Sequence, residues 1–182
     1  IYVMHEAEKL GFTRGDANWC NLGQGQAESG HIEGGLKRIK NIKIEESDNE
    51  YSPVSGLHEF KKAIANSYNS MYRNGLESKY THANVAICPG GRAALTRVAA
   101  SLGRINFGHF IPDYTAYEEM LGIFNSLNTI PILLNGSDGY SFSAESLKNE
   151  IMGRGISSIL LSNPCNPTGK LISKLKLKKW IE

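Results

Sequence analysis

The sequence contains few cysteines, and their positions exclude two common stabilising frameworks. Cys20, Cys88 and Cys165 are far apart, form no Cys-x-x-Cys pair and belong to no Cys/His cluster. A disulfide scaffold normally uses an even number of cysteines, and a structural zinc site needs closely spaced ligands. We therefore expect no metal site, and cysteine usage of this kind is typical of a reducing, cytoplasmic location.

Long apolar runs are also missing from the sequence. No stretch approaches the ~20 consecutive apolar residues that cross a bilayer. Residues 1–10 carry Glu6, Glu8 and Lys9 where a signal peptide would have an apolar core. We expect no membrane segment. Because the chain does not begin with Met and stops inside an expected helix, we interpret both ends as cuts in a longer protein.

Neither sign of charge is in marked excess. The 20 Lys and Arg residues against 18 Asp and Glu residues give a formal net charge of +2. A nucleic-acid-binding face requires clustered basic residues. The densest basic run, at residues 174–179, is typical of a solvated helix face. We therefore expect no nucleic-acid partner, and the 182 residues are enough for about one domain with a real core.

From residue 56 onward, the apolar residues alternate between helical and strand patterns. The spacing of Leu57, Phe60 and Ile64 predicts an amphipathic helix that ends near Asn74-Gly75. Such alternation predicts an α/β protein with a largely parallel sheet and helices on both faces. Before residue 56, the pattern predicts a weak helix over 1–10 and a loop over 15–35. After the first helix we expect strands over 84–88, 106–111, 129–134 and 156–161, and helices over 92–102, 114–125, 143–152 (N-capped by Ser143) and 171–182.

Two glycines follow the first expected strand and open a helix. In open α/β sheets, ligands bind beyond the carboxyl ends of the strands. Gly90 and Gly91 would let backbone N–H groups approach an anion such as phosphate at the positive end of the helix dipole, with help from Arg92. The alternative is a tight turn that binds nothing. Because the segment matches neither the Walker pattern nor Gly-x-Gly-x-x-Gly, it does not indicate classical nucleotide binding.

The segments after the next strands are also distinctive. Tyr114 and Tyr117 follow the second expected strand, where an aromatic ring can stack on a planar cofactor or serve as an ordinary core residue. Residues 163–169 read Asn-Pro-Cys-Asn-Pro-Thr-Gly and follow the last expected strand. Two Asn-Pro pairs in seven residues favour a rigid turn that aims an amide side chain such as that of Asn166.

Five segments in this order resemble the class I/II aminotransferases, which are pyridoxal-phosphate (PLP) enzymes of fold type I. The resemblance extends from about residue 19 to the end of the chain. It implies an incomplete three-layer αβα sandwich with a mostly parallel sheet. Residues 1–50 would form an N-terminal arm, and residues 51–182 part of the PLP-binding large domain. The segments are Asn21-Leu-Gly-Gln-Gly25-Gln, Tyr51-x-x-x-x-Gly56-x-x-x-Phe60-Lys61, Pro89-Gly-Gly-Arg-Ala-Ala94, Pro112-x-Tyr114-x-x-Tyr117 and Asn163-Pro-Cys-Asn-Pro-Thr-Gly169.

The resemblance also implies which residues hold the phosphate of PLP. Gly90, Gly91 and Arg92 resemble the phosphate-binding turn, which acts through backbone N–H groups. Many relatives carry a hydroxyl residue or a lysine where Arg92 stands, so this position departs from the common pattern. Tyr51 resembles the tyrosine that crosses a homodimer interface to the phosphate of the neighbouring subunit.

Three further residues acquire roles from the same resemblance. Tyr114 resembles the ring that stacks on the pyridine, and Asn166 the amide that donates to the phenolic oxygen of the cofactor. Gly25 resembles the backbone contact to the substrate α-carboxylate. The implied partners are therefore PLP, an amino acid, a 2-oxo acid and a second copy of the chain.

The implied reaction transfers an amino group between an amino acid and a 2-oxo acid. In the family, the Schiff-base lysine comes several dozen residues after the segment that contains Asn166, so we expect it beyond Glu182 and no catalytic residue within this chain. The fragment alone should therefore be inactive. Three alternatives stay open: another fold type I reaction (a C–S lyase, synthase or decarboxylase), an aminotransferase-like effector domain of a transcriptional regulator, and a truncated, non-catalytic remnant.

Overall fold

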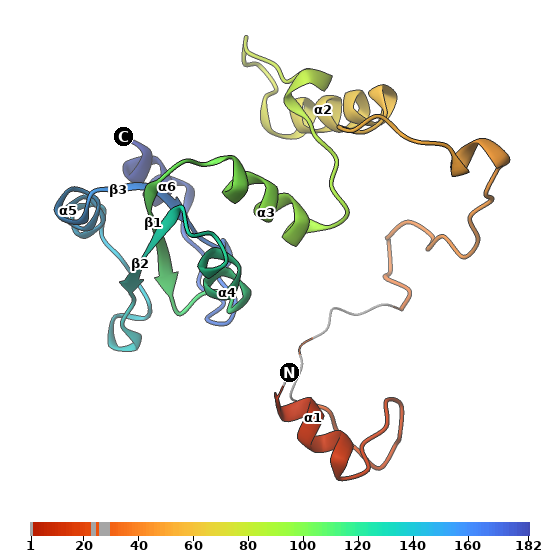
Figure 1. The fold of residues 1–182 in the computed structure, drawn as a ribbon, viewed down its shortest axis with the longest axis horizontal. Coiled ribbons are helices and arrows are strands. Elements are labelled where there is room, and N and C mark those ends of the chain that lie inside the picture. The colour runs from red at the N-terminus through yellow and green to blue at the C-terminus, as the bar shows by residue number, and fades with distance from the viewer. Residues whose placement is uncertain (1, 23–24, 26–29) are drawn as a thin grey trace. The chain divides into compact units, whose positions relative to one another are not determined.

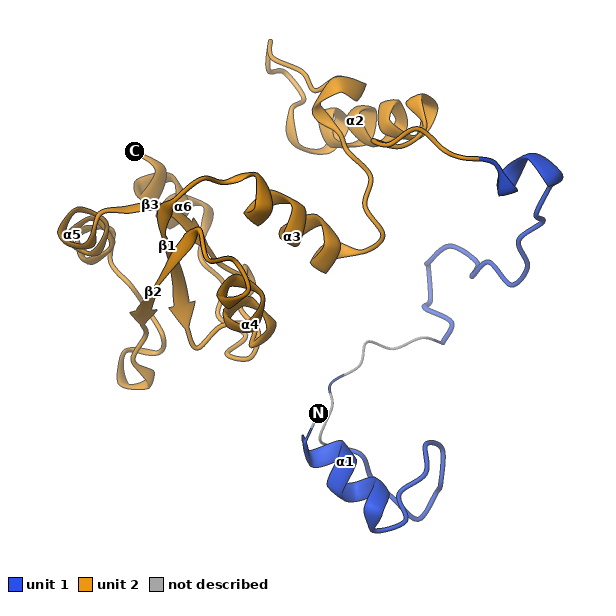
Figure 2. Cartoon of the chain, viewed as in Figure 1, with its two compact units in different colours: residues 1–50 blue, residues 51–182 orange. Residues whose placement is uncertain are grey.

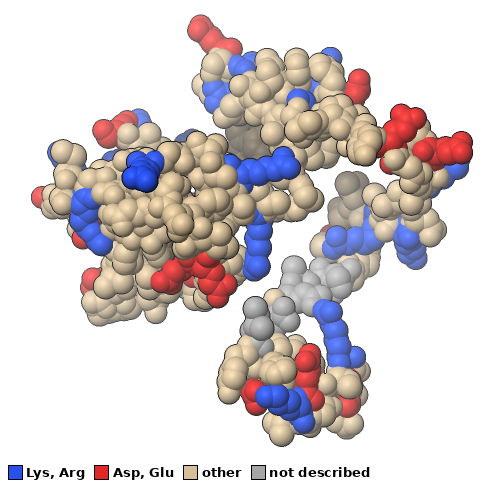
Figure 3. Space-filling model, viewed as in Figure 1, with Lys and Arg blue, Asp and Glu red and all other residues tan. Residues whose placement is uncertain are grey.

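The computed structural model describes residues 2–22, 25 and 30–182, and the chain divides into two compact units, residues 1–50 and 51–182 (Figure 2). The first unit contains α1 (Tyr2–Lys9), which confirms the helix predicted over residues 1–10, and the short 3-10 helix η1 (Glu46–Asn49). Gly23, Gln24 and Gln26, in the motif around Gly25, lie outside the described residues. On the face in view, side chains of both charge signs occur on each unit (Figure 3).

The second unit begins with the predicted amphipathic helix, α2 (His58–Tyr72). Its C-cap is Arg73, and Gly75 follows with a φ of 77°.

Among the helices of the described residues, none combines the length and the apolarity that a membrane span requires.

The strand predicted over residues 84–88 is wrong. The 3-10 helix η2 (His82–Asn84) occupies the start of this segment, where the Thr81 hydroxyl accepts a hydrogen bond from the Ala83 N–H. The backbone N–H of Ile87 donates to the carbonyl of Ser55 at 3.0 Å instead of to a strand. Apolar β-branched residues favour a strand only where a partner edge is available. In the described part of the chain, no strand pairs with this segment.

Three parallel strands form the sheet at the centre of the second unit. They are β1 (Ile105–Ile111), β2 (Leu127–Leu133) and β3 (Ile156–Leu160), in the spatial order β2-β1-β3 (Figure 1). β1 pairs with β2 without interruption, whereas its pairing with β3 shifts register between Asn106 and Phe107. The parallel sheet is confirmed, and its carboxyl edge is where β1 and β3 end side by side.

Helices pack on both faces of this sheet, as the sequence predicts. The buried residues of one face include Ala99 of α3 (Gly91–Ser101) and Leu121 of α4 (Ala116–Gly122). Those of the other face include Leu147 of α5 (Ala144–Arg154), with Trp180 of α6 (Lys174–Ile181) packed against them. The side chains of a strand alternate between the two faces, and Phe107 and Phe110 of β1 accordingly join opposite clusters. The α/β three-layer fold is therefore confirmed.

Local chemistry sets the boundaries of the helices. The Ser143 hydroxyl accepts a hydrogen bond from the Ser146 N–H at 2.9 Å, which confirms the predicted N-cap of α5. Ser173 caps α6 in the same way, so that helix begins later than residue 171. α4 is shorter than the predicted helix over 114–125, which leaves Tyr114 in the loop that follows β1.

Candidate functional site

The backbone at the beginning of α3 is not crowded by other atoms. Gly90 is the N-cap, with a φ of 90° and a ψ of 159°, a conformation that is essentially restricted to glycine. A Cβ atom added at Gly90 or Gly91 would meet nothing within 4 Å, so space is free beside both residues. The first N–H groups of a helix have no intrahelical partner and carry its positive dipole end. This helix start therefore has the geometry of an anion site.

The structure brings Arg92 and Tyr114 together from two elements. The Arg92 guanidinium donates a 2.7 Å hydrogen bond to the Tyr114 hydroxyl, and its Cζ atom lies 5.7 Å from the centroid of that ring. The hydrogen bond to Tyr114 is the main cause that raises the pKa of Arg92 above its ordinary value. Arg92 follows the glycines of α3, and Tyr114 follows β1. The contact thus places a fixed cation and an aromatic ring next to the helix start.

A hollow of about 440 Å³ lies beside Tyr114. Its volume falls within the range of about 300–1,000 Å³ that is typical of small-molecule pockets. Tyr117 meets Tyr114 edge to face, with the ring centroids 5.5 Å apart. Pro167 reaches the same hollow from the loop after β3. The carboxyl ends of two neighbouring strands therefore contribute to one cavity.

Asp113 ties these two strand ends together. Its side chain is 9% exposed, and one carboxylate oxygen accepts from the Tyr114 N–H at 2.6 Å. The other oxygen accepts from the Ser162 N–H at 3.0 Å, across 49 positions of sequence. The Ser162 hydroxyl in turn donates to the Tyr117 hydroxyl at 3.0 Å. Asp113 consequently fixes the loop that carries Tyr114 against the loop that carries Asn166.

The loop after β3 is also held from within. The Asn163 side chain exchanges hydrogen bonds with the backbone of Ile172, accepting at 2.8 Å and donating at 3.2 Å. The backbone N–H of Cys165 donates to the carbonyl of Lys170 at 2.9 Å, and both Asn-Pro bonds are cis. Asn166 is exposed in this loop, next to Pro167 at the hollow. The rigid turn indicated by the sequence thus presents the Asn166 amide to solvent.

Three residues of the predicted site, Asn166, Tyr51 and Gly25, are not joined to the others by any described contact. The side chain of Tyr51 is fully exposed, at 106% of its reference area. Gly25 is exposed and belongs to the first unit. The predicted roles of Tyr51 and Gly25 involve a second copy of the chain or a substrate. Gly90, Gly91, Arg92 and Tyr114 are the residues that the structure gathers.

A buried histidine of β1 lies at the site, and its shifted pKa predicts a pH-dependent stability. His109 is 4% exposed and lines the hollow beside Tyr114. Burial lowers the pKa of His109, and the nearby carboxylates of Glu118 and Asp113 oppose this only in part. Because the folded state then binds a proton less readily than the unfolded chain, stability should fall as the pH drops below about 6.5, the ordinary histidine value.

Urea unfolding of His109→Gln over this pH range should show a flatter loss of stability than the unchanged chain shows. The exposed His31→Gln is the matched control and should keep the original slope. Equal slopes for all three proteins would contradict a buried neutral His109.

The sequence does not single out Asp113, Ser162 or His109. An aspartate between a proline and a tyrosine after a strand end was the available signal for Asp113, but burial cannot be read from it.

In the described part of the chain, no group of three His, Cys, Asp or Glu side chains could hold a metal ion.

A parallel sheet with a glycine-led helix start and a tyrosine at its carboxyl edge is typical of α/β proteins that bind an anionic ligand at that edge. The family model of aminotransferase class I and II matches residues 17–182. The chain therefore belongs to the class I and II aminotransferase family.

Individual proteins and solved structures that are similar to this chain are consistent with this family. The aspartate aminotransferase of Sulfurisphaera tokodaii is 26% identical over 144 residues, covering 76% of this chain and 34% of that protein. 1-Aminocyclopropane-1-carboxylate synthase 6 of Arabidopsis thaliana is 24% identical over 152 residues, covering 75% and 30%. A mutant Thermus thermophilus aspartate aminotransferase superposes with a TM-score of 0.62 at 21% identity, covering 72% and 35%. The chain thus spans about a third of the length of these relatives.

Proposed function

We propose that the full-length protein is a PLP-dependent aminotransferase that moves an amino group between an amino acid and a 2-oxo acid. We further propose that residues 51–182 form part of its PLP-binding large domain. The observation that carries this proposal is the Arg92–Tyr114 contact at the open start of α3, beside the hollow, in a member of this family. The proposal includes a cytoplasmic homodimer.

The residues at the start of α3 fit a phosphate group. Gly90 and Gly91 leave the space of two side chains empty, so backbone N–H groups can approach an anion closely. The Arg92 guanidinium adds a permanent positive charge, and its bond to Tyr114 holds it in place. We assign the phosphate of PLP to this turn, with Tyr51 of the second subunit contributing its hydroxyl.

The ring of the cofactor is assigned to Tyr114 and Asn166. The Tyr114 ring lines a cavity large enough for a flat heterocycle, and offset stacking of two aromatic rings is favourable. Asn166 offers an amide donor from a rigid loop, which suits a hydrogen bond to the phenolic oxygen. Bound PLP would supply an electron sink for the amino acid α-carbon, while these residues bind and orient it. The backbone of Gly25 is assigned to the substrate carboxylate.

Substitution of the two glycines tests the phosphate assignment. In the full-length protein, Gly91→Ala should weaken PLP binding by at least about tenfold, roughly 1.4 kcal/mol, because a methyl group would occupy the space left for the anion. Stability should change little, since Gly91 is a helical residue and alanine favours helices. Equilibrium dialysis measures the affinity, and thermal unfolding without PLP measures the stability.

Two controls separate this effect from general damage. Gly103→Ala also places a methyl group in open space and should leave PLP affinity unchanged. Gly90→Ala forces a side chain into a glycine-only conformation and should in addition cost about 1–3 kcal/mol of stability. Normal PLP affinity in Gly91→Ala would remove the phosphate from this turn.

A second candidate function keeps the cofactor and changes the reaction. Its support is the similarity to a protein named 1-aminocyclopropane-1-carboxylate synthase, alongside those named aminotransferases. Product analysis of the full-length protein with single amino acids distinguishes the two. An aminotransferase consumes one molecule of 2-oxo acid for each molecule of amino acid that it converts. A lyase, synthase or decarboxylase forms its product without an amino acceptor. A regulator would instead carry a DNA-binding domain in the upstream coding sequence.

A further inference from the structure

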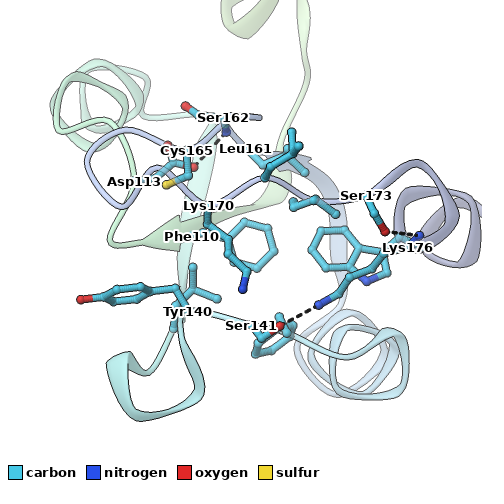
Figure 4. A pocket seen from close by; sticks show the side chains of 15 residues that line it. Phe110, Asp113, Tyr140, Ser141, Leu161, Ser162, Cys165, Lys170, Ser173 and Lys176 are labelled. Carbon is cyan, nitrogen blue, oxygen red and sulfur yellow. Dashed lines mark hydrogen bonds between the residues drawn. The ribbon is translucent and has the colours of Figure 1, made fainter.

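A second cavity lies on the face of the sheet that packs against α5 and α6, and it is walled by aromatic rings (Figure 4). Phe110 of β1 stacks on Trp180 of α6, with centroids 5.8 Å apart and an interplanar angle of 25°. Phe142 meets Phe110 edge to face at 5.8 Å. The cavity volume is about 240 Å³, just below the range typical of drug-sized ligands, so it suits a single-ring molecule.

Two lysines reach over this cavity from different elements. Figure 4 shows Lys170 coming from the loop after β3 and Lys176 from α6. The Lys176 ammonium donates to the Ser141 hydroxyl at 3.1 Å and lies 5.7 Å from the centroid of the Trp180 ring. Within the described part of the chain, no carboxylate lies within ion-pair distance of either ammonium.

The charges of the two lysines are close enough to affect each other. Burial, and secondarily the charge of Lys170, lowers the pKa of Lys176. Within the solvated helix face expected over residues 174–179, Lys174, Lys178 and Lys179 are exposed, whereas Lys176 is half-buried. Two like charges beside one cavity are unfavourable unless an anion compensates them.

Two other polar groups at the cavity are the Asp113 carboxylate and the Trp180 indole. The Asp113 carboxylate accepts backbone N–H bonds through both oxygens, and in the described part of the chain it lies beyond ion-pair distance of both ammonium groups. The indole N–H of Trp180 is buried without a hydrogen-bond partner among the described residues. An unpaired buried donor costs free energy.

We propose that this cavity binds a small aromatic carboxylate, whose ring packs against Phe110 and Trp180 and whose carboxylate is held by Lys170 and Lys176. The aromatic walls select a flat apolar body, and the two ammonium groups select an anionic end. The lining includes none of the residues assigned to PLP. The site therefore adds a ligand class to the proposed transaminase function and does not depend on it.

Tryptophan fluorescence tests this proposal directly. The chain has two tryptophans, so Trp19→Phe makes Trp180 the sole reporter. In the 182-residue chain carrying this change, phenylacetate should alter Trp180 emission saturably. The neutral 2-phenylethanol should bind at least about tenfold more weakly, a difference of roughly 1.4 kcal/mol. The neutral probe keeps the ring and removes the charge.

Lysine variants in the same background locate the anion. Lys170→Met and Lys176→Met should each weaken phenylacetate binding about fivefold to tenfold while the binding of 2-phenylethanol stays the same. Lys170→Arg should retain it. Lys179→Met removes an exposed lysine of α6 and is the matched control, with no expected effect.

Three results would overturn the proposal. These are the absence of a saturable change with phenylacetate, equal affinity for the neutral probe, and unchanged affinity in Lys170→Met. Because Lys170 and Lys176 lie on different elements, unfolding of one variant leaves the other to decide. Thermal unfolding of each variant identifies such a failure.

Discussion

Replacing Asp113 by alanine should lower the free energy of unfolding by about 3–5 kcal/mol, a large part of the stability of a typical domain. The carboxylate is buried and accepts hydrogen bonds from the N–H groups of Tyr114 and Ser162. Alanine leaves both donors without their acceptor and opens a small void at the end of β1. Urea unfolding followed by circular dichroism measures the change.

Two further variants test whether this loss of stability comes from the two hydrogen bonds that Asp113 accepts. Asp113→Asn keeps the size of the side chain and one acceptor oxygen, so its loss should be intermediate. Asp138→Ala removes an exposed aspartate that accepts from the neighbouring Ser137 hydroxyl, and it should change stability by less than about 1 kcal/mol. A loss in Asp113→Ala no larger than in Asp138→Ala would contradict the tie between the two strand ends.

The 182-residue chain, supplied with PLP, an amino acid and a 2-oxo acid, should show no transamination at all. The reason is our proposal that the lysine to which such enzymes attach the cofactor lies beyond Glu182. Without that amine there is no group to shuttle the α-proton. A coupled assay for the product amino acid, and PLP absorbance after adding amino acid alone, measure both halves of the reaction. Full-length protein is the positive control.

Activity in the isolated chain would contradict this proposal. A PLP-dependent half-reaction with the 182 residues would place the required amine within them. Substitution of each lysine in turn would then identify it, starting with Lys170 and Lys174 in and after the loop that follows β3.

Periodicity predicted most of the fold because it reports burial along each segment. The spacing of apolar residues gave α2, α3 and α5 to within a few residues, and the capping serine of α5 was readable from its hydroxyl type. The error at residues 84–88 has a physical origin. A short β-branched run looks the same whether it pairs with a strand or packs without one, and here Val85 and residues of α2 line the same hollow.

The site was less predictable because its contacts join distant positions. The glycines of α3 and the rigid loop after β3 were visible as local patterns. The Arg92–Tyr114 bond spans 22 positions, and the bond from Ser162 to Asp113 spans 49. Neither follows from spacing alone. Lys176 likewise belongs to a run of lysines whose members differ in burial only after the helix has packed.

Borohydride reduction of the full-length protein, purified from its source and saturated with PLP, tests most directly whether it is a PLP enzyme. Intact mass and peptide mapping then locate any reduced cofactor. We predict a species much heavier than 20.0 kDa that carries one PLP adduct on a lysine beyond Glu182. A species with the mass of this chain and no specific adduct would contradict this prediction, and would identify the protein as a remnant of an aminotransferase that no longer performs the reaction.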